Sequence, residues 1–155
     1  MRMRHDYPIR SRLILLLSLL ALAGCANDIN MQVESDVPTP LSEKIPLSVG
    51  IYYNDNFRNF VFKENSEVRK DWTIDTRTSR MSLFNDILPS MFNSVRQVTD
   101  PAAAGAGVDV VIEPEVVDMQ VAMPEETHSD IYEAWIKYEI KMYHPTGAPL
   151  STWQI

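Results

Sequence analysis

The sequence has little positive charge, few histidines and one cysteine, and each shortage excludes a class of function. Lys and Arg number 14 against 21 Asp and Glu, so the formal net charge is −7. A chain this acidic repels nucleic acid and anionic lipid headgroups, and no basic patch with interleaved aromatic residues offsets the repulsion. The single cysteine, Cys25, has no second cysteine to pair with. We therefore expect no nucleic-acid partner and no disulfide framework.

Recognisable catalytic and metal-binding patterns are also missing. The chain contains no G-x-S-x-G, no Walker-type phosphate loop and no H-E-x-x-H. His128 and His144 fall in or beside predicted turns, with no neighbouring cysteine and no metal-type spacing. We therefore expect no catalytic residue, no metal ligand and no cofactor, and we expect that the protein is not an enzyme.

Two acidic groups resemble functional sites, but structural roles are favoured for both. The predicted turn over residues 124–130 holds three acidic residues, yet it lacks the glycine and the alternating spacing of a calcium loop. Glu113 and Glu115 flank Pro114 and share a face of a predicted strand. Paired carboxylates can do acid–base work, but here we expect them to mark a β-bulge.

The first 24 residues have the composition of a secretory signal. Residues 1–12 contain four arginines, and residues 13–23 read LILLLSLLALA. A basic start followed by an apolar stretch of this length is typical of a signal peptide. The stretch is too short to span a bilayer as a helix, which takes about 20 residues. A buried core helix is the alternative, but the stretch has neither a polar face nor a helix cap.

The residues Leu22, Ala23, Gly24 and Cys25 resemble the lipobox of bacterial lipoproteins, L-[AS]-[GA]-C. The resemblance implies cleavage before Cys25, a diacylglyceryl thioether on its sulfur, and usually an acyl chain on the new N-terminus. Two or more acyl chains anchor a protein stably where one does not. Ala26 follows the cysteine, and in the lipoprotein sorting pattern a residue other than Asp favours the outer membrane. We therefore expect a lipid-anchored protein on the periplasmic face of the bacterial outer membrane.

Beyond the signal, the length of the chain allows one domain. Residues 25–45 are predicted to be the lipidated cysteine and a flexible tether, because residues 26–44 have no sustained period and contain Pro38 and Pro40. An ordered N-terminal arm packed on the domain is the alternative. Residues 46–155 are predicted to form the folded domain.

Period-2 alternation of apolar residues predicts most of the strands in this domain. The first strand covers residues 46–53, and two short strands at 59–65 and 70–76 are expected to form a hairpin. A long strand over 108–123 changes the parity of its apolar residues around Pro114, which predicts a β-bulge there. Strands at 131–144 and 150–155 follow, separated by a turn at PTGAP.

One amphipathic helix is predicted between these strands. Its apolar stripe consists of Phe84, Leu88, Met91, Val95 and Val98. Pro89 is expected to kink this helix without ending it, since the apolar pattern keeps its phase beyond the proline. The order of elements predicts an α+β fold, in which the kinked helix covers one face of a mostly antiparallel sheet and the flanking strands form a βαβ crossover.

Trp135 is the one candidate contact residue on the predicted domain surface. It shares a strand face with Glu133 and Lys137, and an aromatic residue on a polar face often marks a contact surface. The alternative is that another element of the fold covers it.

The order of elements resembles the ABC-type transport auxiliary lipoproteins and, more loosely, the LPS-assembly lipoprotein. The shared features are the early strand, a short hairpin ending at Trp72, the amphipathic helix, an apolar strand and a strand pair that turns through HPTGAPLSTW. The resemblance implies a non-enzymatic protein that binds partner proteins or lipid. We therefore expect a periplasmic accessory or assembly lipoprotein that acts through protein–protein contact. A lipid- or glycan-binding module and an envelope hydrolase are the alternatives.

The end of the sequence predicts a longer protein. Residues 150–155 still alternate up to Ile155, whereas natural ends usually fray in polar residues. One helix also leaves part of the predicted sheet uncovered. We expect the chain to continue with a helix on the same face as Phe84 and Leu88.

Overall fold

The computed structural model describes residues 29–32, 43–64 and 71–155. The lipobox-like residues 22–25 and most of the predicted tether lie outside these ranges. The described elements are β1 (Ile29–Gln32), β2 (Ile45–Tyr52), α2 (Asp55–Asn59), β3 (Phe62–Glu64), β4 (Trp72–Asp75), α3 (Arg77–Met91), β5 (Phe92–Val98), the 3-10 turn η1 (Pro101–Ala103), β6 (Val110–Ala122), α4 (Pro124–Thr127), β7 (Glu133–Tyr143) and β8 (Pro149–Gln154).

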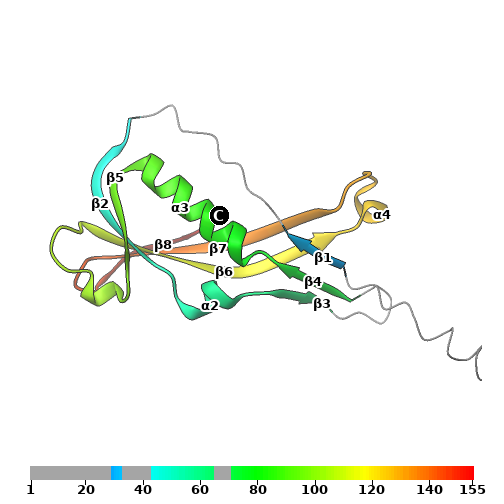
Figure 1. The fold of residues 1–155 in the computed structure, drawn as a ribbon, viewed down its shortest axis with the longest axis horizontal. Coiled ribbons are helices and arrows are strands. Elements are labelled where there is room, and N and C mark those ends of the chain that lie inside the picture. Colours follow the sequence, from blue (N-terminus) through cyan, green and yellow to red (C-terminus); the bar gives the residue numbers. More distant parts are fainter. Residues whose placement is uncertain (1–28, 33–42, 65–70) are drawn as a thin grey trace, which may run out of the picture.

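The strands form two sheets (Figure 1). The larger has the order β5-β2-β6-β7-β8, and the smaller has the order β1-β4-β3. β2 pairs in parallel with both β5 and β6, so the expected crossover through a helix is present. The longest pairing is antiparallel and joins β6 to β7 over 11 residue pairs, and β7 pairs antiparallel with β8. The predicted α+β class is confirmed, and so is the hairpin of β3 and β4.

Helix α3 ends earlier than the predicted helix. It begins at Arg77 and ends at Met91, and residues 92–98 form β5. The prediction of one kinked helix through Val98 is therefore wrong. Pro89 lies in the last turn of α3 and has no backbone N–H to donate to the preceding turn. The helix ends two residues later, at Met91. The apolar residues after it, Phe92, Val95 and Val98, are three apart and suit a helical period, but parallel pairing with β2 makes this segment a strand.

The predicted β-bulge is present but is displaced along the strand. The register of β6 against β7 shifts between Val116 and Asp118, so Val117 is the extra residue. Its side chain is exposed, while Val116 and Met119 on either side are buried. Pro114 needs no bulge, because it has no backbone N–H to pair on the β2 side. The pairing of β6 with β2 ends at Ile112, and at Pro114 the described pairing of β6 is with β7 alone.

The predicted tether contains a short strand. Residues 29–32 form β1 and pair in parallel with β4, from Ile29 opposite Trp72 to Gln32 opposite Asp75. These four residues therefore form an ordered arm, which was the alternative to a flexible tether. At the other end of the predicted tether, its last residue, Ile45, is the first residue of β2. The rest of the tether, apart from residues 43 and 44, lies outside the described residues.

The main core lies between α3 and the larger sheet. Its buried side chains are Val49, Ile51, Tyr53, Phe57, Phe84, Leu88, Phe92, Val110, Ile112, Val116, Tyr138 and Ile140. Phe57 on α2 stacks on Tyr53 with 5.3 Å between ring centroids and meets the edge of Phe84 at 5.5 Å. Val111 alternates with Val110 and Ile112, so it belongs to a second cluster on the other face, with Val98 and Val108.

We predict that Leu88 on α3 contributes strongly to stability and that Asp86 does not. Leu88 is buried in the main core, and Asp86 is exposed on the opposite side of the helix. Leu88→Ala should lower the free energy of unfolding by about 2–5 kcal/mol, since it leaves a cavity. Asp86→Ala should change it by less than about 0.5 kcal/mol. Urea melts of the two variants check this, and equal effects would contradict the observed packing of α3.

Candidate functional site

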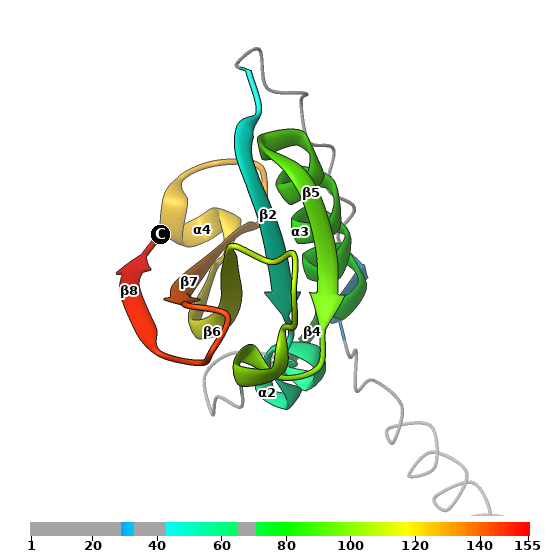
Figure 2. The ribbon, with the colours of Figure 1, turned by 90° about the vertical axis from the view of Figure 1, so that its left-hand side faces the viewer.

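An apolar groove runs between α3 and the edge of the larger sheet. Its volume is about 260 Å³, and every side chain that lines it is apolar or aromatic. Leu83, Ile87 and Met91 on α3 form one wall. Trp153 and Ile155, at the end of the chain beside β7, form the other wall. In the view of Figure 2, α3 lies near β5 and β2, away from β8.

One helical period and one pairing register produce this groove. Leu83, Ile87 and Met91 are four residues apart, so they form one row along α3, next to the row that enters the core. On the sheet, Ile140 lies opposite Trp153 in the pairing of β7 with β8. Two backbone hydrogen bonds between Tyr138 and Ile155, at 2.9 and 3.0 Å, extend that register to the last residue.

The groove is open to solvent along its walls. Met91 is 39% exposed, Trp153 41% and Ile155 65%. Large apolar side chains that are exposed side by side are unusual on a soluble surface and mark contact sites. The groove can therefore bind an apolar ligand or segment by the hydrophobic effect, which stabilises by about 25 cal/mol for each Å² of apolar surface buried.

The two carboxylates that flank Pro114 lie on the other face of the sheet and hold neighbouring elements. Glu113 accepts hydrogen bonds from Asn54 Nδ2 and from the Tyr143 hydroxyl, both at 2.8 Å. Burial, and then the hydrogen bond to Glu113, raises the pKa of Tyr143 to about 12. These contacts fix the start of α2 and the end of β7 to β6.

Glu115 completes this polar cluster. It pairs with Lys141 on β7, and it accepts a hydrogen bond from Asn56 Nδ2 at 3.3 Å. The hydrogen bond from Lys141 holds the pKa of Glu115 below its usual range. The carboxylates therefore bind α2 and β7 and do not mark the bulge, which lies at Val117.

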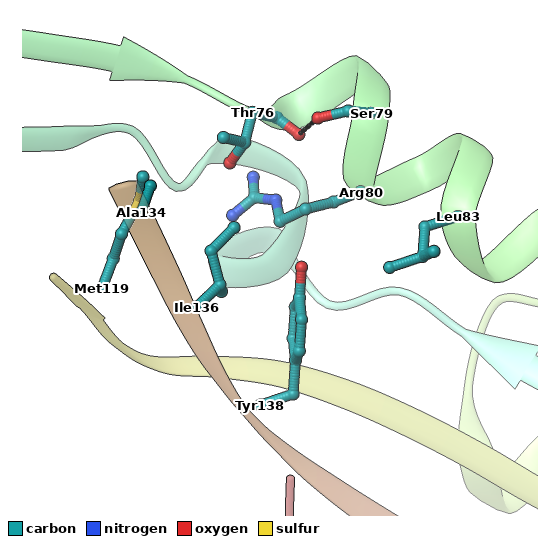
Figure 3. Close-up of a pocket in the computed structure, with 8 residues that line it drawn as sticks. All are labelled: Thr76, Ser79, Arg80, Leu83, Met119, Ala134, Ile136 and Tyr138. Atoms are coloured by element: carbon teal, nitrogen blue, oxygen red, sulfur yellow. Dashed lines mark hydrogen bonds between the residues drawn. The ribbon is translucent and has the colours of Figure 1, made fainter. Parts of the chain in front are cut away.

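The sequence reasoning missed a buried arginine. Arg80 on α3 is 1% exposed, and its guanidinium lies over the rings of Phe57 and Phe60 at 5.3 and 5.1 Å from the centroids. Its Nη2 donates to the Phe60 carbonyl at 2.9 Å. Arg80 lines a cavity of about 150 Å³ next to the groove (Figure 3). The four-residue spacing from Arg80 through Phe84 to Leu88 is the signal that places it on the buried face.

The other predicted positions are not brought together. Trp135 is 51% exposed on β7, on the face of the sheet opposite the groove. His128 ends α4 with a left-handed backbone, and His144 Nδ1 lies 2.8 Å from Thr146 Oγ1 in a turn. Within residues 29–32, 43–64 and 71–155, no group of three or more His, Cys, Asp or Glu side chains could hold a metal ion.

The loop predicted over residues 124–130 contains the short helix α4. Glu126 accepts a hydrogen bond from the backbone N–H of Met123 at 3.1 Å and thereby caps this helix. At least one acidic side chain of the loop therefore has a structural partner. None of the helices in the described part of the chain is both long and apolar enough to cross a membrane.

The chain is similar to a solved structure, but only weakly. No family model matches the sequence, and no curated protein matches it. Among solved structures, the chain is similar to a crystal structure of a Xanthomonas campestris protein assigned to the family model DUF330. The two chains share 8% sequence identity with a TM-score of 0.48, and the similarity covers 82% of this chain and 75% of the other.

We predict that a fluorescent dye specific for apolar surfaces binds in the groove. Met91→Glu should weaken dye binding by about tenfold, because a carboxylate must then be desolvated where the dye lies. Trp135→Ala is the matched control, since Trp135 is also exposed but lies on the other face. Fluorescence titrations of the two variants and the unaltered chain check this. Equal dye binding by the Met91→Glu variant and the unaltered chain would show that the groove does not bind the dye.

Proposed function

We propose that this chain is a lipid-anchored accessory or assembly protein of the bacterial cell envelope, and that its domain acts by contact with a partner protein and not by catalysis. The observation that carries the proposal is the open groove between α3 and the end of β8, which is lined by apolar and aromatic side chains alone. A surface of this kind provides binding free energy and no reactive group.

The anchor is supported by the lipobox-like residues that end at Cys25. The proposed mature protein begins at Cys25 with its acyl chains in the outer membrane and the domain in the periplasm. Its acidic composition disfavours adsorption to anionic headgroups. Membrane association then depends on the lipid, and the domain surface is available for partners.

An amphipathic helix of a partner protein is the occupant that suits the groove best. One wall is itself a helix, whose row of Leu83, Ile87 and Met91 can pack beside a second helix at the usual 8–10 Å between axes. The floor is a flat sheet surface that includes Ile140 and Met142. Apolar anchors of the partner, spaced three and four residues apart, would be buried against both surfaces.

Lipid binding is the second candidate function. The specific observation in its favour is that the residues of the groove lining carry only two side-chain polar groups, the Tyr138 hydroxyl and the Trp153 indole N–H. An acyl chain forms no hydrogen bonds with water, so no hydrogen bond of the ligand is lost when it enters such a groove.

Site-specific photo-crosslinking in bacteria that carry the full chain separates these functions. A benzophenone amino acid at position 153 should form a discrete protein adduct, because Trp153 lies on the groove wall. The same amino acid at position 86, on the exposed side of α3, is the control and should give none. A lipid adduct at position 153 would favour the second candidate. Equal labelling at both positions would contradict a role for the groove.

We also predict that Cys25 is the site of lipid attachment. Cys25→Ser removes the thiol that would form the thioether, so the variant should incorporate no labelled palmitate and should keep its signal peptide. The domain should remain folded, because residue 25 lies outside the described elements. Palmitate labelling and the mass of the purified chain are the measurements. Palmitate incorporation by the variant at the level of the unaltered chain would contradict the anchor.

A further inference from the structure

Arg80 is a buried cation that makes no ion pair with an acid among the described residues. Desolvation of a guanidinium is costly unless hydrogen bonds and opposite charge offset it. Phe60 provides one carbonyl acceptor, and Phe57 and Phe60 each provide one ring face. Asp75 attracts the guanidinium electrostatically, but its carboxylate is bound by the exposed side chain and the backbone N–H of Arg77. Burial accordingly lowers the pKa of Arg80 below its usual range.

Three polar atoms beside the cavity have no hydrogen-bond partner within the described part of the chain. They are Nε and Nη1 of Arg80 and Oγ1 of Thr76. Both residues are buried and line the same cavity of about 150 Å³. Figure 3 shows the hydroxyl of Thr76 and the hydroxyl end of Tyr138 directed toward the guanidinium. Buried donors are nearly always satisfied in folded proteins, so an acceptor is expected at this place.

The position of the cavity adds a second preference for negative charge. Thr76 is the N-cap residue of α3, and its side chain makes no capping hydrogen bond. The N-terminus of a helix of 15 residues has a partial positive charge that favours anions. The remaining lining includes Leu83, Met119 and Ile136, which exclude water and strengthen the electrostatic attraction.

We propose that the Arg80 cavity is a binding site for a small oxyanion, a carboxylate or a phosphate group, which accepts hydrogen bonds from Arg80 Nε or Nη1 and from the Thr76 hydroxyl. The anion neutralises the buried guanidinium and occupies the space between α3 and β7. This site is separate from the polar cluster of Glu113 and Glu115, and it does not depend on the partner protein proposed above.

The oxyanion has two sources that the geometry admits. It is either a free ion or the head of an amphiphile whose chain lies in the apolar groove. The second source is possible sterically because Leu83 and Tyr138 line both the cavity and the groove. In either case the recognised chemistry is the same, and the chain length of the ligand distinguishes the two.

Titration of the full chain with defined anions tests the site. The readout is the NMR signal of the Arg80 Nε–H group, identified by its loss in Arg80→Lys. Sodium acetate, inorganic phosphate and decanoate are added separately at constant ionic strength, and decanol provides the same chain without the carboxylate. A saturable shift of the Arg80 signal with acetate or phosphate is the expected result. The exposed Arg77 provides an internal control that should not respond in the same way.

Two hydroxyl variants keep the test independent of Arg80 substitutions that fail to fold. Thr76→Val should weaken anion binding by about tenfold, as expected for a lost hydrogen bond to a charged group. Ser79→Ala is the matched control, because Ser79 lines the same cavity but its hydroxyl donates to the Thr76 carbonyl at 3.0 Å. The half-saturation concentration of the Ser79→Ala variant should lie within about twofold of that of the unaltered chain.

Each result of the titrations either identifies the source of the anion or overturns the proposed site. Decanoate that saturates at a much lower concentration than acetate, and decanol that leaves the Arg80 signal unchanged, would identify an amphiphile head. Equal saturation by acetate and decanoate would identify a free anion. No saturable shift with acetate, phosphate or decanoate would overturn the proposal, and so would parallel shifts of the Arg77 and Arg80 signals.

Discussion

The packing of two adjacent rows of α3 against the larger sheet determines most of what this domain presents to its surroundings. The row of Arg80, Phe84 and Leu88 faces the sheet, and its two apolar members close the main core. The neighbouring row of Leu83, Ile87 and Met91 lies at the boundary of that contact and becomes a wall of the groove. Since both rows belong to one rigid helix, core packing and groove geometry cannot change independently.

The long antiparallel pairing of β6 with β7 provides the surface on which this helix lies. It directs Tyr138 and Ile140 into the core and, through the pairing of Ile140 with Trp153, brings the last residues beside the floor of the groove. The same alternation sends Glu113, Glu115 and Lys141 to the other face, where they hold α2 and β7 in place. The face toward α3 is thus apolar and is open at the groove, and the other face carries a hydrogen-bonded polar cluster as well as the second apolar cluster at Val111.

Arg80 shows how a core position can carry a charge. The helical period places its side chain with Phe84 and Leu88, and the rings of Phe57 and Phe60 cover the flat faces of the guanidinium. The Phe60 carbonyl accepts from one guanidinium nitrogen, and Nε and Nη1 of this cavity-lining residue are left without a hydrogen-bond partner in the described part of the chain. A methionine or leucine at this position would fill the same space at no electrostatic cost. The buried charge is therefore the feature on which the proposed oxyanion site rests.

The sequence by itself determined the elements whose period is local. The alternation along β7, the hairpin of β3 and β4 and the buried face at Phe84 and Leu88 follow from side-chain directions along one segment. The expected lipidation at Cys25 also rests on a local pattern, in residues outside the described elements.

Tertiary structure decided the features that need a partner segment. Residues 92–98 suit a helix by period, yet β2 supplies a parallel edge for them and they form a strand. The bulge falls at Val117, where pairing with β7 slips, and not beside Pro114. The groove exists because α3 meets β7 and β8, and the Arg80 cavity exists because α3 meets β6 and β7, all of them distant in sequence. A periodic pattern reports which way a side chain points along its own backbone, and it carries no information about which distant backbone it meets.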